Sequence, residues 1–512
     1  MNSNSLTQRY LFKLTTSILI VPLNLVMISF ISRSLGPNLF GQYRYLIYFF
    51  TMFSGFLGFG GNFLTSELAK NHKDKLLISF YQVFIILGWV ITGIILIVAF
   101  GLNKLIFLFP EISNHGYVFL AFLLAYITFM TQMYESISDA TGLTKSSSII
   151  NLISKFFGVI LLIIFIYLVN WINLYSIMFI SIIMSLISAF LFAYILWSNN
   201  IDVKLFKISW VDFKNKFKQF FNYSHPLLTL SIVTFTLGLF MRWGLQLFGG
   251  SAEQGYFSFS DSFSGFIIIF GNSITPLLQR EFSITYNDSD NERMKLIFER
   301  SLLIFISFTS LLSIFVLFNT KTITMLIGGN SYNSSILSTQ IMLFYPIPYI
   351  ANNILYSTCY ATNKTKLLRN VQIFIVILNT IITFLLIAPQ KYWGLNLGAI
   401  GFALSLVAVT YLNHIILLIY CSKMFDLNWF NLIFKYLRII GAFMIIGLFC
   451  FFLDKVLTFN PIYILILNAF LYFSVSILLM FYLPSLVGFS NININEYIKI
   501  VKLKFSNIFK TI

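Results

Sequence analysis

Charged residues are scarce in this sequence. Asp, Glu, Lys and Arg together make 10% of the 512 residues, whereas a soluble globular domain carries about 25%. Hydrophobic residues make 58%, and the mean hydropathy is +0.87. Too few polar side chains are present to cover a soluble fold, so we expect a membrane protein. The same shortage argues against a soluble nucleic-acid-binding protein, although the net charge is +16.

Residues suited to disulfide, metal or nucleophile chemistry are few and scattered. The chain has three cysteines, Cys359, Cys421 and Cys450, and four isolated histidines. It has no Gly-rich phosphate loop, no HExxH and no GxSxG motif. We therefore expect no disulfide framework, no metal site and no cofactor, and we do not expect an enzyme.

Long apolar runs fill the rest of the chain. Fourteen runs reach about the 20 residues that a membrane helix needs, and none alternates as a barrel strand would. The runs are 14–32, 45–64, 76–100, 117–134, 149–169, 174–197, 226–248, 257–278, 302–318, 336–360, 371–388, 397–420, 439–457 and 462–483. This pattern predicts an all-α polytopic membrane protein with fourteen transmembrane helices.

The distribution of Lys and Arg predicts the orientation. If the N-terminus is cytoplasmic, 26 of the 33 basic residues fall in cytoplasmic segments and 7 in external ones. Cytoplasmic loops of membrane proteins carry such an excess. We therefore predict that both termini are cytoplasmic, and most of the net charge is explained by topology.

Weak sequence matches suggest an internal repeat. Arg33 matches Arg242, Gly61-Asn62 matches Gly271-Asn272, and an A-T-x-x-T-K motif begins at both Ala140 and Ala361, with offsets of 209, 210 and 221 positions. These matches predict two pseudo-symmetric lobes of six helices that share one orientation. The predicted segments are an N-terminal lobe (1–198), a linker (199–222), a C-terminal lobe (223–420), a second linker (421–438), helices 13 and 14 (439–483) and a cytoplasmic tail (484–512).

Each linker carries an amphipathic pattern. Ser209 and Asp212 fit a capping box, and Phe213, Phe217 and Phe220 share one helical face. This pattern predicts a helix lying on the inner leaflet. Asp426 is expected to cap a similar helix in the second linker.

One segment carries a family signature. Residues 31–43, I-S-R-S-L-G-P-N-L-F-G-Q-Y, resemble the first-loop motif of the polysaccharide-biosynthesis (O-antigen-type, Wzx-like) flippases of the multidrug/oligosaccharidyl-lipid/polysaccharide (MOP) exporter superfamily. Residues 249–256 resemble the matching element of the second half. The signature positions are Gly36, Pro37, Gly41, Tyr43, Gly255 and Tyr256.

The resemblance implies a MATE-like fold and a transport function. Members of the family move undecaprenyl-diphosphate-linked oligosaccharide repeat units from the inner to the outer leaflet of the bacterial cytoplasmic membrane by alternating access. The expected partners are this lipid-linked glycan, the bilayer and other polysaccharide assembly proteins, and a monomer without bound nucleic acid is expected.

Four basic residues are candidates for a cationic cavity. Charges within a bilayer are costly and usually face a cavity or a partner. We expect Arg242, Arg33, Arg44 and Lys155 to bind the diphosphate and acidic sugars of the substrate. Alternatively, Arg33, Arg44 and Lys155 snorkel to the headgroups, and Arg242 snorkels or pairs with Asp261.

Four acidic residues are candidates for H⁺ or Na⁺ coupling. They are Asp261, Glu135, Asp139 and Glu67. Glu135 and Asp139 are spaced i, i+4 and could share a proton or a cation, or could form a solvated helix end.

Other functions stay open. A teichoic-acid or exopolysaccharide precursor exporter and a small-molecule antiporter belong to the same superfamily. A membrane glycan polymerase or acyltransferase is disfavoured, because the external loops are short and His414 has no partner in the sequence pattern.

Overall fold

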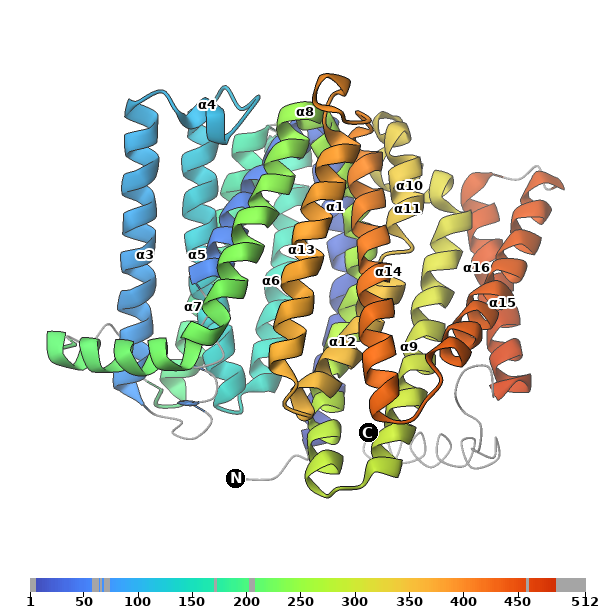
Figure 1. Ribbon diagram of the computed structural model, residues 1–512. Coiled ribbons are helices and arrows are strands. Elements are labelled where there is room, and N and C mark those ends of the chain that lie inside the picture. The colour runs from blue at the N-terminus through green and yellow to red at the C-terminus, as the bar shows by residue number, and fades with distance from the viewer. Residues whose placement is uncertain are drawn as a thin grey trace. The chain divides into compact units, whose positions relative to one another are not determined.

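The computed structural model describes residues 6–57, 64, 67–68, 74–169, 173–201, 208–456 and 460–484. Within these ranges every regular element is a helix, which confirms the all-α prediction (Figure 1). The helices are α1 (Leu6–Leu57), α3 (Lys75–Gly101), α4 (Leu105–Leu108), α5 (His115–Ala140), α6 (Thr144–Ile164), η1 (Phe165–Val169), α7 (Leu174–Ser198), α8 (Trp210–Asn287), α9 (Asn291–Phe318), α10 (Thr320–Gly328), η2 (Asn330–Ser335), α11 (Ile336–Met342), α12 (Pro346–Ala361), α13 (Thr365–Ile387), η3 (Gln390–Tyr392), α14 (Gly398–Met424), α15 (Trp429–Val456) and α16 (Pro461–Tyr482).

Eleven of the described helices are long and apolar enough to cross a membrane, so the chain is a multi-pass membrane protein. Two of them, Phe12–Gly55 in α1 and Leu228–Asn287 in α8, have 44 and 60 residues. At a rise of about 1.5 Å per residue, each is at least twice as long as a bilayer core of about 30 Å is thick. The tenth predicted run is divided between α11 and α12. The predicted count of fourteen crossings is consistent with this arrangement and stays a prediction.

Glycine breaks both long helices. Gly36 in α1 has φ 66° and ψ 173°, and Gly250 in α8 has φ 81° and ψ 176°. Positive φ is costly for residues with a side chain, so glycine suits both positions. Pro37 follows the first break, where its missing N–H is not needed. After the second break, the N–H of Ser251 donates to Glu111 Oε2 at 2.6 Å.

The segments that follow the two breaks pack directly against each other. A Cβ on Gly41 would overlap the carbonyl oxygen of Ser251, and a Cβ on Gly255 would overlap the carbonyl oxygen of Pro37. Each glycine therefore lies against the first turn of the opposite segment. Four signature positions, Gly36, Pro37, Gly41 and Gly255, thus build one helix crossing.

This crossing gives a different repeat register from the predicted one. The broken positions, 36 and 250, and the contact glycines, 41 and 255, are each separated by 214 positions. At that offset Arg242 corresponds to Ile28, not to Arg33. The predicted equivalence of the two arginines is wrong, because residue-type matching placed the register five positions away.

The first part of α8 is the predicted amphipathic helix. Ser209 Oγ accepts from the N–H of Asp212 at 3.1 Å and donates to its carboxylate at 2.6 Å, which confirms the predicted cap. The aromatic face packs against α3. The ring centres of Phe213 and Phe220 lie 5.2 and 6.0 Å from the ring centre of Phe80. This segment crosses one end of α3 in Figure 1.

The second linker differs from its prediction. Helix α15 begins at Trp429 and continues without interruption into the thirteenth predicted span. Its first turn is capped by Asn428, whose side-chain oxygen accepts from the N–H of Phe430 at 3.0 Å. Asp426 has φ 51° and lies before that turn, so its predicted capping role is wrong.

The chain forms two compact units. One consists of Met1–Ser273, Thr324–Ile341 and Arg369–Val409, and the other of Ile274–Ile323, Met342–Leu368 and Thr410–Ile512. Within the first unit, α1, α5, α6 and α7 pack side by side, and within the second, α9 packs against α12, α15 and α16. The predicted lobe boundaries stay a prediction. Gly61–Asn62 of the predicted repeat, residues 202–207 of the first linker and 485–512 of the predicted tail lie outside the described residues.

Candidate functional site

A cavity lined by both polar and apolar side chains lies among α1, α5, α6 and α7. Its volume is about 280 Å³. Six of the residues that line it carry a hydroxyl group: Tyr43, Thr51, Ser54, Thr128, Ser181 and Ser185. These hydroxyl groups lie within membrane-crossing segments.

Helical spacing positions these groups. Thr128 and Gln132 are four residues apart on α5, and Ser181 and Ser185 are four apart on α7. Residues at i and i+4 share one helix face, so each pair points to the same side. These polar i, i+4 pairs are visible in the sequence, but the predicted site residues do not include them.

Hydrogen bonds join the walls of the cavity. The hydroxyls of Tyr43 and Ser181 are 3.3 Å apart, and those of Thr128 and Ser185 are 3.2 Å apart. These bonds link α1 and α5 to α7. They also give the signature residue Tyr43 a place in the cavity wall.

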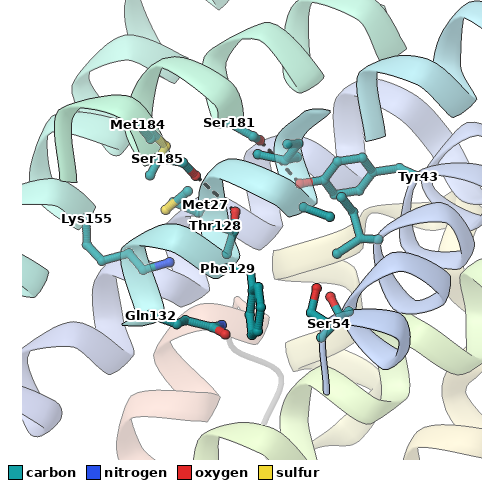
Figure 2. A pocket seen from close by; sticks show the side chains of 14 residues that line it. Met27, Tyr43, Ser54, Thr128, Phe129, Gln132, Lys155, Ser181, Met184 and Ser185 are labelled. Carbon is teal, nitrogen blue, oxygen red and sulfur yellow. Dashed lines mark hydrogen bonds between the residues drawn. The ribbon is translucent and has the colours of Figure 1, made fainter. Parts of the chain in front are cut away.

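Lys155 supplies the charge of the cavity. Its side chain extends from α6 with the ammonium group directed into the space near Gln132 and Phe129 (Figure 2). Among the described residues, none forms an ion pair or a hydrogen bond with this ammonium group, and no carboxylate lines the cavity. The cavity therefore combines one cation with hydroxyl, amide and apolar groups.

Arg242 lies in a separate cluster. Its guanidinium carbon is 4.3 Å from the ring centre of Phe257, 4.4 Å from that of Tyr48 and 5.3 Å from that of Phe402. One guanidinium nitrogen lies 3.5 Å from Asp261, and the Arg242 side chain is only 8% exposed. The alternative that Arg242 pairs with Asp261 is confirmed.

Arg33 is engaged elsewhere. Its guanidinium donates to the carbonyls of Met325, Leu326 and Ile327, at 3.0, 2.6 and 3.2 Å. These carbonyls belong to the last turn of α10, which attracts a cation. Arg44 lies 5.9 Å from the ring centre of Phe40. The four predicted cations therefore do not meet in one place, and only Lys155 lines the cavity.

Both members of the predicted acidic pair, Glu135 and Asp139, bond to neighbouring side chains. Lys13 lies 2.8 Å from Asp139, and Asn151 donates to Glu135 at 2.7 Å. Glu67 stands between residues 65–66 and 69–73, which lie outside the described part of the chain. The coupling roles of Asp261, Glu135, Asp139 and Glu67 stay predictions.

Two further carboxylates were not singled out from the sequence. Glu111 accepts from Ser251, and Glu253 accepts from the N–H of Ala399 at 2.7 Å, at the start of α14. Both carboxylates stabilise the N-terminal ends of helical segments far away in the sequence. No short-range pattern reveals such partners, because they are about 140 residues apart.

The second unit contains its own polar cluster. His414 Nδ1 lies 3.0 Å from Asn352 Oδ1, and the imidazole is buried. Cys359 and Cys421 lie 3.8 Å apart between their sulfur atoms and are not bonded to each other. The sequence pattern predicted neither contact. Among the described residues, no group of three His, Cys, Asp or Glu side chains could hold a metal ion.

A match to a family model shows which protein family the chain belongs to. The model described as polysaccharide biosynthesis protein matches residues 8–278, which is more than half of the sequence. The chain belongs to the polysaccharide biosynthesis protein family. The cavity and the helix crossing both lie within the matched region of this family member.

Solved structures share its fold. The lipid II flippase MurJ in an inward closed conformation is 15% identical, with 93% of this chain and 99% of that one covered and a TM-score of 0.70. An inward-facing multidrug resistance MATE transporter of the MOP superfamily is 13% identical, with 81% and 98% covered and a TM-score of 0.63. A MOP superfamily transporter from Pyrococcus furiosus is 11% identical, with 82% and 96% covered and a TM-score of 0.57.

These similarities show that the family member has the fold of MOP superfamily transporters. No curated protein matches its sequence.

Proposed function

We propose that this protein is a flippase for undecaprenyl-diphosphate-linked oligosaccharide repeat units of the O-antigen or capsule type. It would move them from the inner to the outer leaflet of a bacterial cytoplasmic membrane, with both termini in the cytoplasm. The observation that carries the proposal is the hydroxyl-lined cavity with Lys155, set among membrane-crossing helices of a polysaccharide biosynthesis family member. Hydroxyl groups and one cation are able to bind the hydroxyl and acidic groups of a glycan.

Alternating access is the proposed mechanism. The close contact at Gly41 and Gly255 would be the part of the molecule that must separate when the external side opens. Arg242 and Asp261 both lie on α8, and the Arg242 guanidinium also lies over the ring of Tyr48 on α1, so this cluster would report on that separation. Coupling to H⁺ or Na⁺ would involve Asp261 or the Glu135–Asp139 pair.

A small-molecule exporter is the second candidate, because a multidrug transporter shares the fold. The MurJ structure covers 93% of this chain and the multidrug transporter covers 81%. The greater coverage supports the flippase proposal over the exporter.

Transfer of a lipid-linked glycan between the leaflets of vesicles would test the proposal. The purified protein is reconstituted in proteoliposomes with a fluorescent undecaprenyl-diphosphate oligosaccharide, and the fraction that reaches the opposite leaflet is measured with an impermeant quencher. We expect transfer well above that of protein-free vesicles, and parallel runs with H⁺ or Na⁺ gradients identify coupling. Transfer at the protein-free rate in all gradients, together with export of cationic dyes, would favour the exporter.

A genetic arm tests the same proposal in cells. Deletion of the gene should cause lipid-linked glycan to accumulate on the inner leaflet and surface glycan to be lost. If Arg242→Ala supports wild-type export at normal protein abundance, the expectation that Arg242 binds the substrate is wrong.

A further inference from the structure

We propose that the cavity between α1, α5, α6 and α7 binds one acidic sugar residue of the transported glycan, a hexuronate, with its carboxylate on Lys155. This inference rests on the proposed function and adds a substrate class to it. It makes Lys155 a determinant of glycan specificity. The diphosphate would bind elsewhere.

Charge balance favours a ligand with one negative charge. The ammonium group of Lys155 has no ion-pair partner among the described residues, and no carboxylate lines the cavity. Lys155 is half-buried, and a charge partly removed from water is stabilised by an opposite charge, so the occupant should carry one negative charge. A diphosphate would bring more negative charge than one lysine can balance.

The position of the arginines agrees with this assignment. Planar guanidinium groups suit phosphate because they donate hydrogen bonds in pairs, whereas lysine acts as a point charge. Arg33 is bonded to the end of α10, and Arg242 is paired with Asp261. Neither lines the cavity, so the cavity lacks the groups that best bind phosphate.

The remaining lining groups suit a sugar ring. Hydroxyl groups both donate and accept hydrogen bonds, as do the hydroxyls of a sugar. The Thr128–Ser185 and Tyr43–Ser181 pairs have hydroxyl separations of 3.2 and 3.3 Å, and their hydroxyls could exchange these bonds for bonds to a ligand. Phe129 adds an apolar ring against which one face of a sugar can lie.

The volume limits the occupant to a single residue. Ligand pockets for drug-sized molecules measure about 300–1,000 Å³, and this cavity measures about 280 Å³. It is too small for a whole repeat unit. A single charged residue of the glycan is the occupant that fits both the volume and the charge.

Direct binding would test the inference. Purified full-length protein in phosphatidylcholine nanodiscs is titrated with glucuronate, glucose, glycerol 3-phosphate and pyrophosphate, and binding is followed by saturation-transfer NMR. We expect glucuronate to bind at least tenfold more tightly than glucose, with millimolar affinity. Lys155→Gln should remove that preference, and Lys155→Arg should keep most of it.

Lys145→Gln is the matched control. It removes the same charge from the same helix, and Lys145 does not line the cavity. It should leave glucuronate binding unchanged. Thermal unfolding of each variant checks that a loss of binding is not a loss of folding.

Three results would overturn the inference. They are equal binding of glucuronate and glucose, a preference that survives Lys155→Gln, and tighter binding of glycerol 3-phosphate or pyrophosphate than of glucuronate. The last would assign the cavity to a lipid headgroup or to the diphosphate. Failure of the flippase proposal can be distinguished from these results. It would appear as a lack of lipid-linked glycan transfer in proteoliposomes, whether or not glucuronate binds.

Discussion

At the scale of single residues, several charges within the membrane-crossing segments are balanced by neighbouring side chains. Arg242 has Asp261 and three aromatic rings, and Asp139 has Lys13. Lys155 differs from them, because its ammonium group faces a cavity and is not paired among the described residues. This charge is therefore directly available to a ligand in the cavity.

The Arg242–Asp261 pair gives a prediction about stability. The Arg242 side chain is 8% exposed and the Asp261 side chain 33%. Asp261→Asn leaves a buried cation without its counter-charge, whereas Arg242→Met leaves a carboxylate that water can reach. We expect Asp261→Asn to cost about 2 kcal/mol, less than the 3–5 kcal/mol of a fully buried pair, and Arg242→Met to cost less.

Thermal unfolding of both single variants and the double variant in detergent measures this difference. The double variant should resemble Arg242→Met, because it no longer contains a buried unpaired cation. If Arg242→Met is the more destabilising change, ring packing rather than the ion pair dominates at this position.

The sequence predicted some residue contacts and missed others. Arg242 and Asp261 lie 19 positions apart on one long helix, so the sequence already offers their pairing as an alternative. The bonds from Arg33 to α10 join residues about 290 positions apart. No local pattern encodes such a contact, since it depends on how α1 and α10 pack.

At the scale of elements, two broken helices define the signature motif. Gly36 and Gly250 provide the breaks, while Gly41 and Gly255 allow the segments beyond them to touch. Glycine is thus needed for its backbone freedom at positions 36 and 250, and for its lack of a side chain at positions 41 and 255.

Alanine substitution at the crossing should be severe. In Gly41→Ala or Gly255→Ala the new methyl group meets a backbone carbonyl, which cannot rotate away as a side chain could. We expect a loss of about 3 kcal/mol or more, at the upper end of overpacking costs. The measurement is the yield of folded protein and its thermal midpoint.

Gly55→Ala in α1 and Gly265→Ala in α8 are matched controls, because nothing lies within 4 Å of a Cβ at either position. They should be neutral or slightly stabilising, since alanine favours helix. Equal effects at Gly41 and Gly55 would contradict the contact between the two segments.

The amphipathic helix shows where local reasoning ends. The cap at Ser209 follows from residues three positions apart and was predicted correctly. The partner of the phenylalanine face was not, because the pattern shows only that the face is apolar. Packing on Phe80 is a property of the folded first unit.

At the scale of the whole molecule, the charge distribution predicts which side of the membrane each loop faces. The loop that contains Trp393 is predicted to be external, and the turn that contains Ser289 to be cytoplasmic. Both positions are exposed, Trp393 by 89%. Cys359, Cys421 and Cys450 are all buried, so the native chain gives little background in thiol labelling.

Labelling of intact cells tests this orientation. A membrane-impermeant maleimide should modify Trp393→Cys in intact cells and Ser289→Cys only after permeabilisation. The opposite pattern would invert the proposed topology, and labelling of both from outside would contradict the number of crossings between them.

The sequence by itself determined the class of this protein, its membrane-crossing segments and its family. These properties depend on composition, on run length and on a contiguous motif, all of which are local. The tertiary structure decided the repeat register, the separate roles of Arg33, Arg242 and Lys155, and the cavity. Those features depend on which distant helices pack together, because a charge within the membrane acquires its role from the residues that surround it.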